Sequence, residues 1–556
     1  MNCKPDEVQA TCFDKPGLAI LLSGIVCLAT VGLAGAEQAR MPLLMPDDFG
    51  ELCAVSWRVE LGVLDKNNPL IEGDMPWDAG GVMSHGTVLR DPIDGLWKAW
   101  LVCTPPEEMM ESSLASLPSA LVEWLATVAP EETKGVSSFN HFHRRVCYFQ
   151  STDGVHWTRP KLSNSSFGDH DQTNIVFGGP DGIAQYASVI VDPANREWPY
   201  EMFVLFPNMS RALGGEAPSG LCRYRSRDGK QWQRVGGPIK GPFTSDVCYV
   251  YRGENGGYVG YFRLVRHEDK SGHVPPYEGN PARTNYRVFS PDGEHWTDTE
   301  IIMKRDERDH RDTQYMECVP HKVKGGYLGM VTMYHPITQT LDLRLAASRD
   351  GRKWWFPDRR PCLANPPLGD YGGGMIWQCK DLIVQDNTLY VYYSGSEGIH
   401  RAIWDTRARG LKQVGLESVI TEGSGILPFN GALCRAGWRF DRMYALASSV
   451  GGPTIGTAVT KPQELKGKQL RVNLVTRPPK KSTEPEFDEG YMQVELLDSQ
   501  GEPMAGFTRE DCALLRGDHQ ALQVKWTGGD RCPDEAKKAR FYLKRAFLYG
   551  FEFSLP

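Results

Sequence analysis

Alternating hydrophobic and polar positions run through most of the chain in segments short enough for β-strands. Paired segments of this kind, each pair forming a hairpin, lie at 86–103, 186–206, 246–265, 315–334 and 376–395. Side chains of a strand point alternately to its two faces, so this period of two predicts strands packed on a core. The pattern therefore predicts an all-β protein.

A seven-residue pattern, Ser-x-Asp-Gly-x-x-Trp, follows each of the first four hairpins. Its copies lie at 151–157, 226–232, 290–296 and 348–354. Asp-Gly favours a tight turn, the serine can bond within it, and the tryptophan begins the returning strand. Four strands per repeat are typical of propeller blades, so we predict a five-bladed β-propeller over 37–452, with a β-sandwich as the alternative.

Beyond the predicted propeller the repeat ends and a different set of strands begins. Alternating segments at 469–476, 491–498, 521–526 and 540–553 predict a C-terminal β-sandwich over 453–556. Within the propeller, hydrophobic residues at helical spacing predict a helical insertion at 104–143. It would either pack on the side of the propeller or form a wall beside an active site.

The N-terminal segment has the pattern of a secretory signal peptide, predicted over 1–36. Lys4 and Lys15 precede the apolar stretch 17–36, which ends in the small residues Ala34 and Ala36. A retained membrane anchor is the alternative, since about 20 apolar residues can span a bilayer. Cleavage would give an exported protein, periplasmic or extracellular, with no membrane attachment.

Charge and cysteine content exclude several classes of partner. The net charge is −7 and basic residues form no block, which argues against a nucleic-acid partner. Eleven scattered cysteines follow the predicted signal, without a CxxC pair or zinc-type spacing. We therefore expect no cofactor and no catalytic metal, with a structural Ca²⁺ ion as the one candidate.

The repeats and the tail resemble known carbohydrate-active proteins. The Ser-x-Asp-Gly-x-x-Trp units resemble those of five-bladed glycosidases of glycoside hydrolase families 32 and 43. Segments 467–473 (GKQLRVN), 501–507 (GEPMAGF) and 546–551 (AFLYGF) resemble the C-terminal module of exported family-32-like proteins of planctomycete-type bacteria. These resemblances imply a glycoside hydrolase that acts on a carbohydrate, without indicating which sugar.

Two short strings are similar to family-32 motifs but differ in position. Glu317-Cys318 lies one blade later than in that family. Arg90-Asp91-Pro92 falls in the first hairpin, where these residues are typical of a turn. The family's Asp-Pro-Asn-Gly nucleophile motif is missing. A standard invertase activity is therefore not expected.

Glycoside hydrolysis requires two carboxyl groups that flank the bond. The resembling families take them from the first strands of different blades. We predict Asp78 as base or nucleophile, Glu317 as general acid, and Asp246 as the carboxylate that orients the sugar or raises the pKa of the acid. Asp312 and Asp370 stand at similar strand starts, so either could be the acid instead.

Other polar and aromatic residues near these strand ends are predicted to bind the substrate. They are Asp312, Tyr315, Arg263, Asp370, Trp377 and His400. Two have a structural alternative, because Arg263 could form a salt bridge between blades and Tyr315 could only pack.

The sequence thus predicts an exported glycoside hydrolase that releases a terminal sugar from a poly- or oligosaccharide. A furanoside and an anhydro sugar are the candidates for that sugar. One alternative is a glycoside phosphorylase, which needs one carboxylic acid and a basic phosphate pocket. Another is a propeller that binds carbohydrate without catalysis.

Overall fold

The computed structural model describes most of the chain from residue 41 onward. The described residues are 41–556 except 107–108, 110–143, 179–183, 185, 207–219, 240, 242–246, 255, 267–281, 311, 401–430, 450–453 and 479–488. The predicted signal peptide 1–36 and most of the predicted insertion 104–143 therefore lie outside the described residues. Within the described part, no helix is long and apolar enough to cross a membrane.

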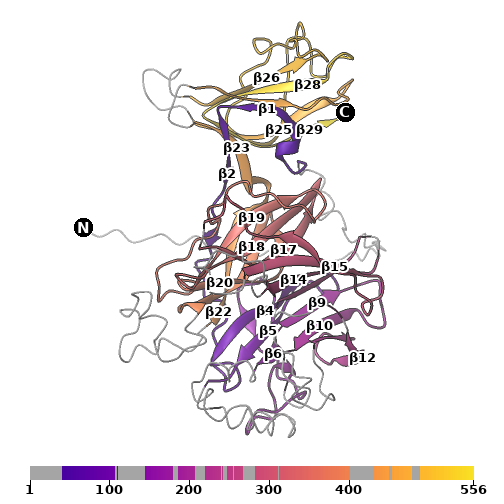
Figure 1. Ribbon diagram of the computed structural model, residues 1–556, viewed down its shortest axis with the longest axis vertical. Helices are drawn as coiled ribbons and strands as arrows, with labels where there is room; N and C mark the ends of the chain where they lie inside the picture. Colours follow the sequence, from indigo (N-terminus) through magenta and orange to yellow (C-terminus); the bar gives the residue numbers. More distant parts are fainter. Residues whose placement is uncertain are drawn as a thin grey trace, which may run out of the picture. The chain divides into compact units, whose positions relative to one another are not determined.

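Regular structure in the described residues consists of β-strands and two short 3₁₀ helices, η1 (Pro46–Asp48) and η6 (Phe440–Arg442). The prediction of an all-β protein is confirmed. Most strands follow one another as antiparallel neighbours, which Figure 1 shows for β4, β5 and β6 and for β17, β18 and β19.

Five successive groups of antiparallel strands make up the larger part of the fold. Group one contains β4 (Gly81–Arg90), β5 (Trp97–Thr104), β6 (Arg145–Ser151), β7 (Trp157–Thr158) and β8 (Ile175–Phe177). Group two contains β9 (Tyr186–Val191), β10 (Tyr200–Phe206), β11 (Gly220–Ser226) and β12 (Gln233–Ile239). Group three contains β13 (Cys248–Arg252), β14 (Tyr258–Arg266), β15 (Ala282–Ser290) and β16 (Glu300–Met303). Group four contains β17 (Gln314–Val323), β18 (Gly326–His335) and β19 (Thr340–Ser348). Group five contains β20 (Met375–Gln385), β21 (Thr388–Ser396), β22 (Gly431–Arg439) and the early strand β3 (Val63–Leu64).

The Ser-x-Asp-Gly turn forms the same hydrogen bonds in each of its four copies. In the first copy, Ser151 Oγ accepts the Gly154 N–H at 2.9 Å, and Asp153 Oδ1 accepts the N–H groups of Val155 and His156 at 2.8 Å each. Gly154 has a φ of +75°, a conformation that disfavours any side chain. The repeat therefore encodes a turn whose shape is set by three side-chain-to-backbone bonds and one glycine.

Each turn also docks on a neighbouring group. The Trp100 indole of group one donates to the Gly229 carbonyl of group two at 2.6 Å. Likewise the Tyr261 hydroxyl of group three meets Gly351 of group four at 3.5 Å, and the Tyr392 hydroxyl of group five donates to Gly154 of group one at 2.8 Å. The last of these bonds joins the final group to the first.

The first strands of the groups lie beside one another in chain order. β4 contacts β9, β9 contacts β13, β17 contacts β20, and β20 returns to β4 through a parallel pairing of Lys380 with Thr87. Groups three and four meet through β14, β15 and β17. Side chains at the starts of these five strands are consequently brought together.

A second set of strands forms two further sheets. One contains β1 (Phe49–Cys53), β24 (Gly456–Thr460), β28 (Lys538–Lys544) and β26 (Tyr491–Leu497). The other contains β2 (Val55–Val59), β23 (Tyr444–Ser448), β29 (Ala546–Ser554), β25 (Gln469–Thr476) and β27 (Asp518–Gln523). The N-terminal strands β1 and β2 thus pair with C-terminal strands, which a boundary placed at 453 did not anticipate.

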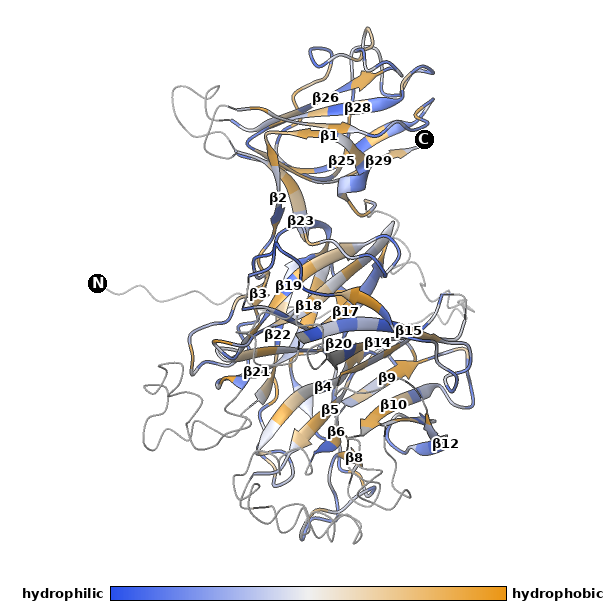
Figure 2. Ribbon diagram, in the orientation of Figure 1, coloured by the Kyte–Doolittle hydropathy of each residue, from blue (hydrophilic) through white to orange (hydrophobic). Residues whose placement is uncertain are grey.

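Burial varies from strand to strand, and Figure 2 shows hydrophobic and hydrophilic residues in the strands of both sets. Every residue of β5 is buried, as expected for a strand covered on both faces. β28 alternates between buried and half-buried positions, typical of a strand with one face toward water. All eleven cysteines described are free thiols. Ten of them are buried and act as small core side chains.

Candidate functional site

Each of the five first strands contributes one buried side chain to a shared cluster. This central cluster consists of His85 on β4, Tyr186 on β9, Tyr249 on β13, Glu317 on β17 and Trp377 on β20. The His85 ring stacks on Tyr186 at 5.5 Å and meets the edge of Trp377 at 4.2 Å, and Tyr186 packs edge-on against Tyr249 at 5.2 Å. Glu317 is the one carboxylic acid among these five side chains.

Irregular pairing in the strands positions two of these residues. The register of β17 with β18 shifts between Tyr315 and Glu317, which inserts Met316 as a bulge. A similar shift lies between Met83 and Thr87 in β4, the stretch that contains His85. Because a bulge turns the following side chain to a new direction, these shifts bring Glu317 and His85 to one place.

The carboxyl group of Glu317 is fully buried, and burial controls its protonation. Its side chain is 0% exposed, and Thr332 Oγ1 donates a hydrogen bond to Oε1 at 3.1 Å. Removal from water raises the pKa of Glu317 to about 7, against the opposing effects of the Tyr249 hydroxyl, the Trp377 indole and the Arg263 charge. A carboxyl group with this pKa can hold a proton near neutral pH and donate it.

Arg263 lies close to Glu317, and Arg283 and His400 lie close to Arg263. Arg263 is buried and attracts the Glu317 carboxylate, while burial and the nearby Arg283 lower its own pKa to about 9. Arg283 lies over the Tyr334 ring at 4.4 Å. Burial and both arginines hold the pKa of His400 well below its ordinary value, so this imidazole is neutral. Arg263 therefore brings a positive charge close to the carboxyl group of Glu317.

Four of the predicted site residues meet in this region. Glu317 and Trp377 belong to the central cluster, Arg263 acts on Glu317, and the His400 ring lies 6.2 Å from that of Trp377. Asp246 lies outside the described residues, so its predicted role stays a prediction. The remaining four have other surroundings.

Asp78 is buried, but its partners differ from those of Glu317. Its Oδ1 accepts the N–H groups of Asp74 and Met75 at 3.0 and 2.8 Å, and its Oδ2 accepts Arg159 Nε at 3.0 Å. Burial raises the pKa of Asp78, and the Arg159 charge opposes that shift. These contacts tie the turn before β4 to the loop after β7, and none of these three hydrogen-bond partners is the Thr332 that binds Glu317.

Asp312 and Asp370 lie in connecting segments. Asp312 Oδ1 accepts the Ile337 N–H at 2.6 Å and thereby ties the start of β17 to the turn after β18. Asp370 is exposed in the turn that precedes β20. Neither has a described interaction with Glu317, and both stay predictions as alternative acids.

Tyr315 lies apart from Glu317 although only one residue separates them. Its hydroxyl donates to Asp309 Oδ2 at 2.9 Å, and its ring packs 5.9 Å from that of Phe356. In a regular strand the two side chains would share a face, but the bulge at Met316 changes the alternation. The described contacts of Tyr315 are those of a packing residue.

The sequence interpretation missed several members of the site because it searched strand starts for carboxylates. Tyr186 and Tyr249 occupy the corresponding positions in groups two and three, and His85 lies within β4. An aromatic residue near the start of β9, β13 and β20 was the available signal. No sequence signal of this kind marked Arg283, which lies on β15, the third strand of group three.

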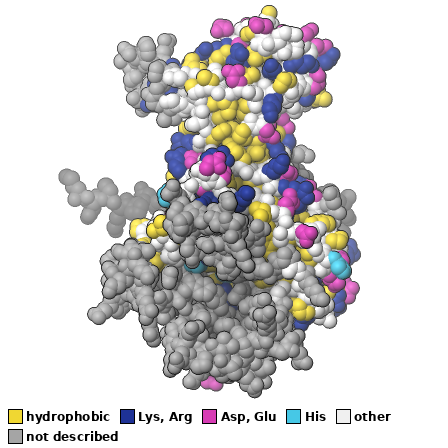
Figure 3. Space-filling model, in the orientation of Figure 1, with side chains coloured by type: hydrophobic (Ala, Val, Ile, Leu, Met, Phe, Trp, Pro, Cys, Tyr) yellow, Lys and Arg dark blue, Asp and Glu magenta, His cyan; other side chains and the backbone are white. Residues whose placement is uncertain are grey.

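The described residues contain no group of three or more His, Cys, Asp or Glu side chains arranged to hold a metal ion. On the face shown in Figure 3, basic and acidic side chains are interspersed over the described surface.

Searches with family models found no match, and no curated protein matched.

Solved structures did match, at low similarity. A β-1,2-mannobiose phosphorylase from Listeria innocua, in complex with β-1,2-mannobiose, is 12% identical, covering 69% of this chain and 98% of its own, with a TM-score of 0.41. A putative glycoside hydrolase from Parabacteroides distasonis is 13% identical over 70% and 98% of the two chains, with a TM-score of 0.41. A thermostable family-43 glycoside hydrolase is 10% identical over 69% and 95%, with a TM-score of 0.37. Similarity at this level assigns neither a family nor an activity, and the resemblance to family 32 and to planctomycete-type proteins stays a prediction.

Proposed function

We propose that this protein cleaves glycosidic bonds and that Glu317 is the general acid. The observation that carries the proposal is a fully buried carboxyl group with a pKa raised to about 7, surrounded by side chains from five separate strands. Such a group can protonate the oxygen of the departing sugar as the bond breaks. Trp377, whose indole acts on Glu317, is the aromatic side chain on which a sugar ring would pack in this proposal.

The proposal includes a propeller architecture. We interpret the five strand groups as the blades of a five-bladed β-propeller and the sheets of β1 and β2 as the layers of a C-terminal β-sandwich. The bond from Tyr392 to Gly154 and the pairing of β20 with β4 support ring closure. A central site in a closed ring favours chain ends, so the expected product is a terminal sugar. Export by the segment 1–36 is part of the same proposal.

Hydrolysis needs a second group that activates water or attacks the sugar directly. Asp246 precedes β13, the strand that carries Tyr249, and is the first candidate for this role. Asp78 is the second candidate, although Arg159 and two backbone N–H groups already bind its carboxylate. Replacement of each by asparagine separates them, because only the true base or nucleophile should be needed for turnover.

Phosphorolysis is a second candidate function, and the charges around Glu317 favour it. A glycoside phosphorylase uses phosphate as the attacking group and needs one carboxylic acid. Arg263 places a guanidinium group near that acid, and Arg283 and the neutral imidazole of His400 lie close to Arg263. In this reaction the phosphate oxygen forms the new bond to the sugar while Glu317 protonates the departing oxygen.

One experiment separates these functions. Purified protein is incubated with neutral oligosaccharides, with and without inorganic phosphate, and the products are resolved by chromatography. Free terminal sugar in both conditions indicates hydrolysis, whereas sugar 1-phosphate formed only with phosphate indicates phosphorolysis. Glu317→Gln should abolish either reaction and retain sugar binding. If no product forms with any substrate while binding is measurable, the protein is a non-catalytic carbohydrate-binding protein.

A further inference from the structure

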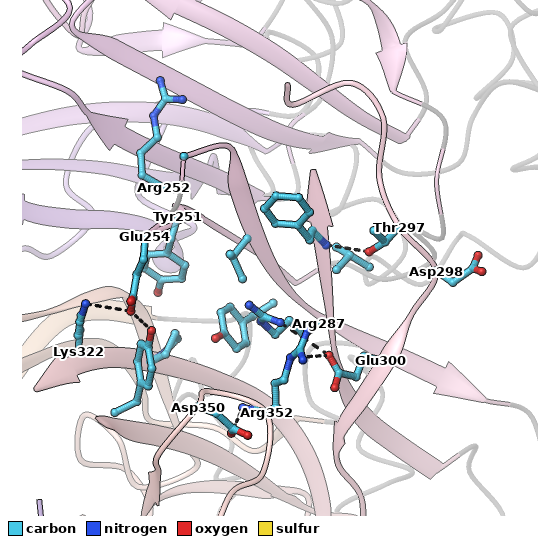
Figure 4. Close-up of a pocket in the computed structure, with 18 residues that line it drawn as sticks. Tyr251, Arg252, Glu254, Arg287, Thr297, Asp298, Glu300, Lys322, Asp350 and Arg352 are labelled. Carbon is cyan, nitrogen blue, oxygen red and sulfur yellow. Dashed lines mark hydrogen bonds and ion pairs between the residues drawn. The ribbon is translucent and has the colours of Figure 1, made fainter. Parts of the chain in front are cut away.

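A cavity of about 750 Å³ lies between groups three and four, away from the central cluster. Its lining comes from the hairpin that joins β13 and β14, from β15, from β17 and from the Ser-x-Asp-Gly turn at Asp350 (Figure 4). No member of the central cluster lines it. Its volume falls within the range of about 300–1,000 Å³ that is typical of small-molecule sites.

Aromatic side chains form part of the cavity wall. Tyr261, Phe289 and Tyr327 all line it. Phe289 is 37% exposed, an unusual exposure for a phenylalanine on a strand within a sheet. Exposed aromatic faces of this kind supply the apolar surface on which the C–H faces of a sugar ring pack.

The charged groups of the cavity are balanced. Four cationic and four anionic side chains line it: Arg252, Arg287, Lys322, Arg352, Glu254, Asp298, Glu300 and Asp350. Two ion pairs are drawn in Figure 4, Lys322 with Glu254 at 3.0 Å and Arg352 with Glu300 at 3.3 Å. The Tyr327 hydroxyl also donates to Glu254. A lining without net charge does not select an ion, but it offers many hydrogen-bond donors and acceptors to a neutral ligand.

We propose that this cavity is a second carbohydrate-binding site, which holds a neutral oligosaccharide or a segment of a neutral polysaccharide. Phe289 and Tyr327 supply the stacking surface, and the paired charges at the opening bind hydroxyl groups. The site goes beyond the proposed catalysis, since it would anchor a long chain without contacting Glu317.

The test is affinity electrophoresis in native gels that contain a soluble arabinan, mannan or β-glucan, with polygalacturonate as an anionic probe. The key variant is Phe289→Ala and the matched control is Ile301→Ala. Ile301 is 38% exposed on the adjacent β16, pairs with Tyr286, and does not line the cavity. Melting temperatures show whether each variant is folded, and Phe289→Leu replaces the alanine variant if that one unfolds.

At least one neutral polysaccharide should retard the wild type and Ile301→Ala equally. Loss of the aromatic face should weaken binding by Phe289→Ala about tenfold. Glu317→Gln should bind like the wild type, so this result is independent of the catalytic proposal. The inference is overturned if no neutral probe retards the wild type, if Phe289→Ala binds normally, if polygalacturonate binds best, or if Glu317→Gln abolishes the retardation.

Discussion

Replacement of Glu317 by glutamine should change both the activity and the pH dependence of stability. Glutamine keeps the size of the side chain and its bond from Thr332, but it cannot release or accept the proton. Turnover should therefore fall by about 10²–10⁴-fold, the contribution typical of general acid catalysis. The bound sugar should be retained, because the aromatic and cationic neighbours are unchanged.

The effect on stability follows from the raised pKa of Glu317. The carboxyl group has a pKa of about 7 in the folded protein against an ordinary value of 4.5, so the folded state binds more protons between these two pH values. Stability consequently decreases as pH rises through that window, and above pH 7 the buried group costs roughly 3 kcal/mol. Glu317→Gln escapes this cost, so its advantage over the wild type should be small at pH 5 and largest near pH 8.

Thermal unfolding of both proteins, followed from pH 5 to pH 8, measures this difference. The melting temperature of the variant should rise relative to the wild type as pH increases. In parallel, the wild-type activity should decline above about pH 7, where the acid loses its proton. If the difference in melting temperature between the two proteins is the same at every pH, Glu317 is not a buried acid with a raised pKa. The assignment then fails even if the variant is inactive.

Three further predictions address the surroundings of the site and the repeat. Tyr249→Phe removes a hydroxyl that lowers the pKa of Glu317, so the alkaline limb of the pH–activity profile should move to higher pH. An unchanged limb would show that this hydroxyl does not act on the acid. Gly229→Ala should lower the melting temperature by several degrees, because the added Cβ would lie 2.8 Å from the Trp100 ring and residue 229 has a φ of +74°. Gly237→Ala should not lower it, because the added Cβ would lie in open space. Equal melting temperatures of the two variants would refute the docking of the turn. Treatment with EDTA should leave activity intact or lower it with loss of stability, and recovery by Zn²⁺ alone would contradict the expectation that any ion is structural.

The repeat made the strands and turns predictable, but not all of their partners. Ser151, Asp153 and Gly154 form the expected turn because its hydrogen bonds are local. The segments at 49–53 and 55–59 could be recognised as strands only in the structure, where their partners lie at the other end of the chain. Alternation predicts that a segment is a strand and carries no information about a distant partner.

The candidate site was predictable to the extent that it follows from strand starts. Glu317 and Trp377 were found in this way, and both lie in the central cluster. Tyr315 was misplaced relative to Glu317 because a bulge in β17 changes the alternation, and a bulge leaves no clear mark in a single sequence. Tyr186 and Tyr249 were missed because the search was for carboxylates and neither residue is one.

The pairing of β1 and β2 with late strands has a consequence for biosynthesis. β2 needs β23, which in turn needs β29 at Ala546–Ser554, so the first strands leave the ribosome hundreds of residues before their sheet can form. Contacts of such long range form slowly, because the loop between the partners must close first. Until β29 has been synthesised, the segment 49–59 has open hydrogen-bonding edges that are prone to association with other chains. A nascent chain of this protein should therefore depend on chaperones until β29 has left the ribosome.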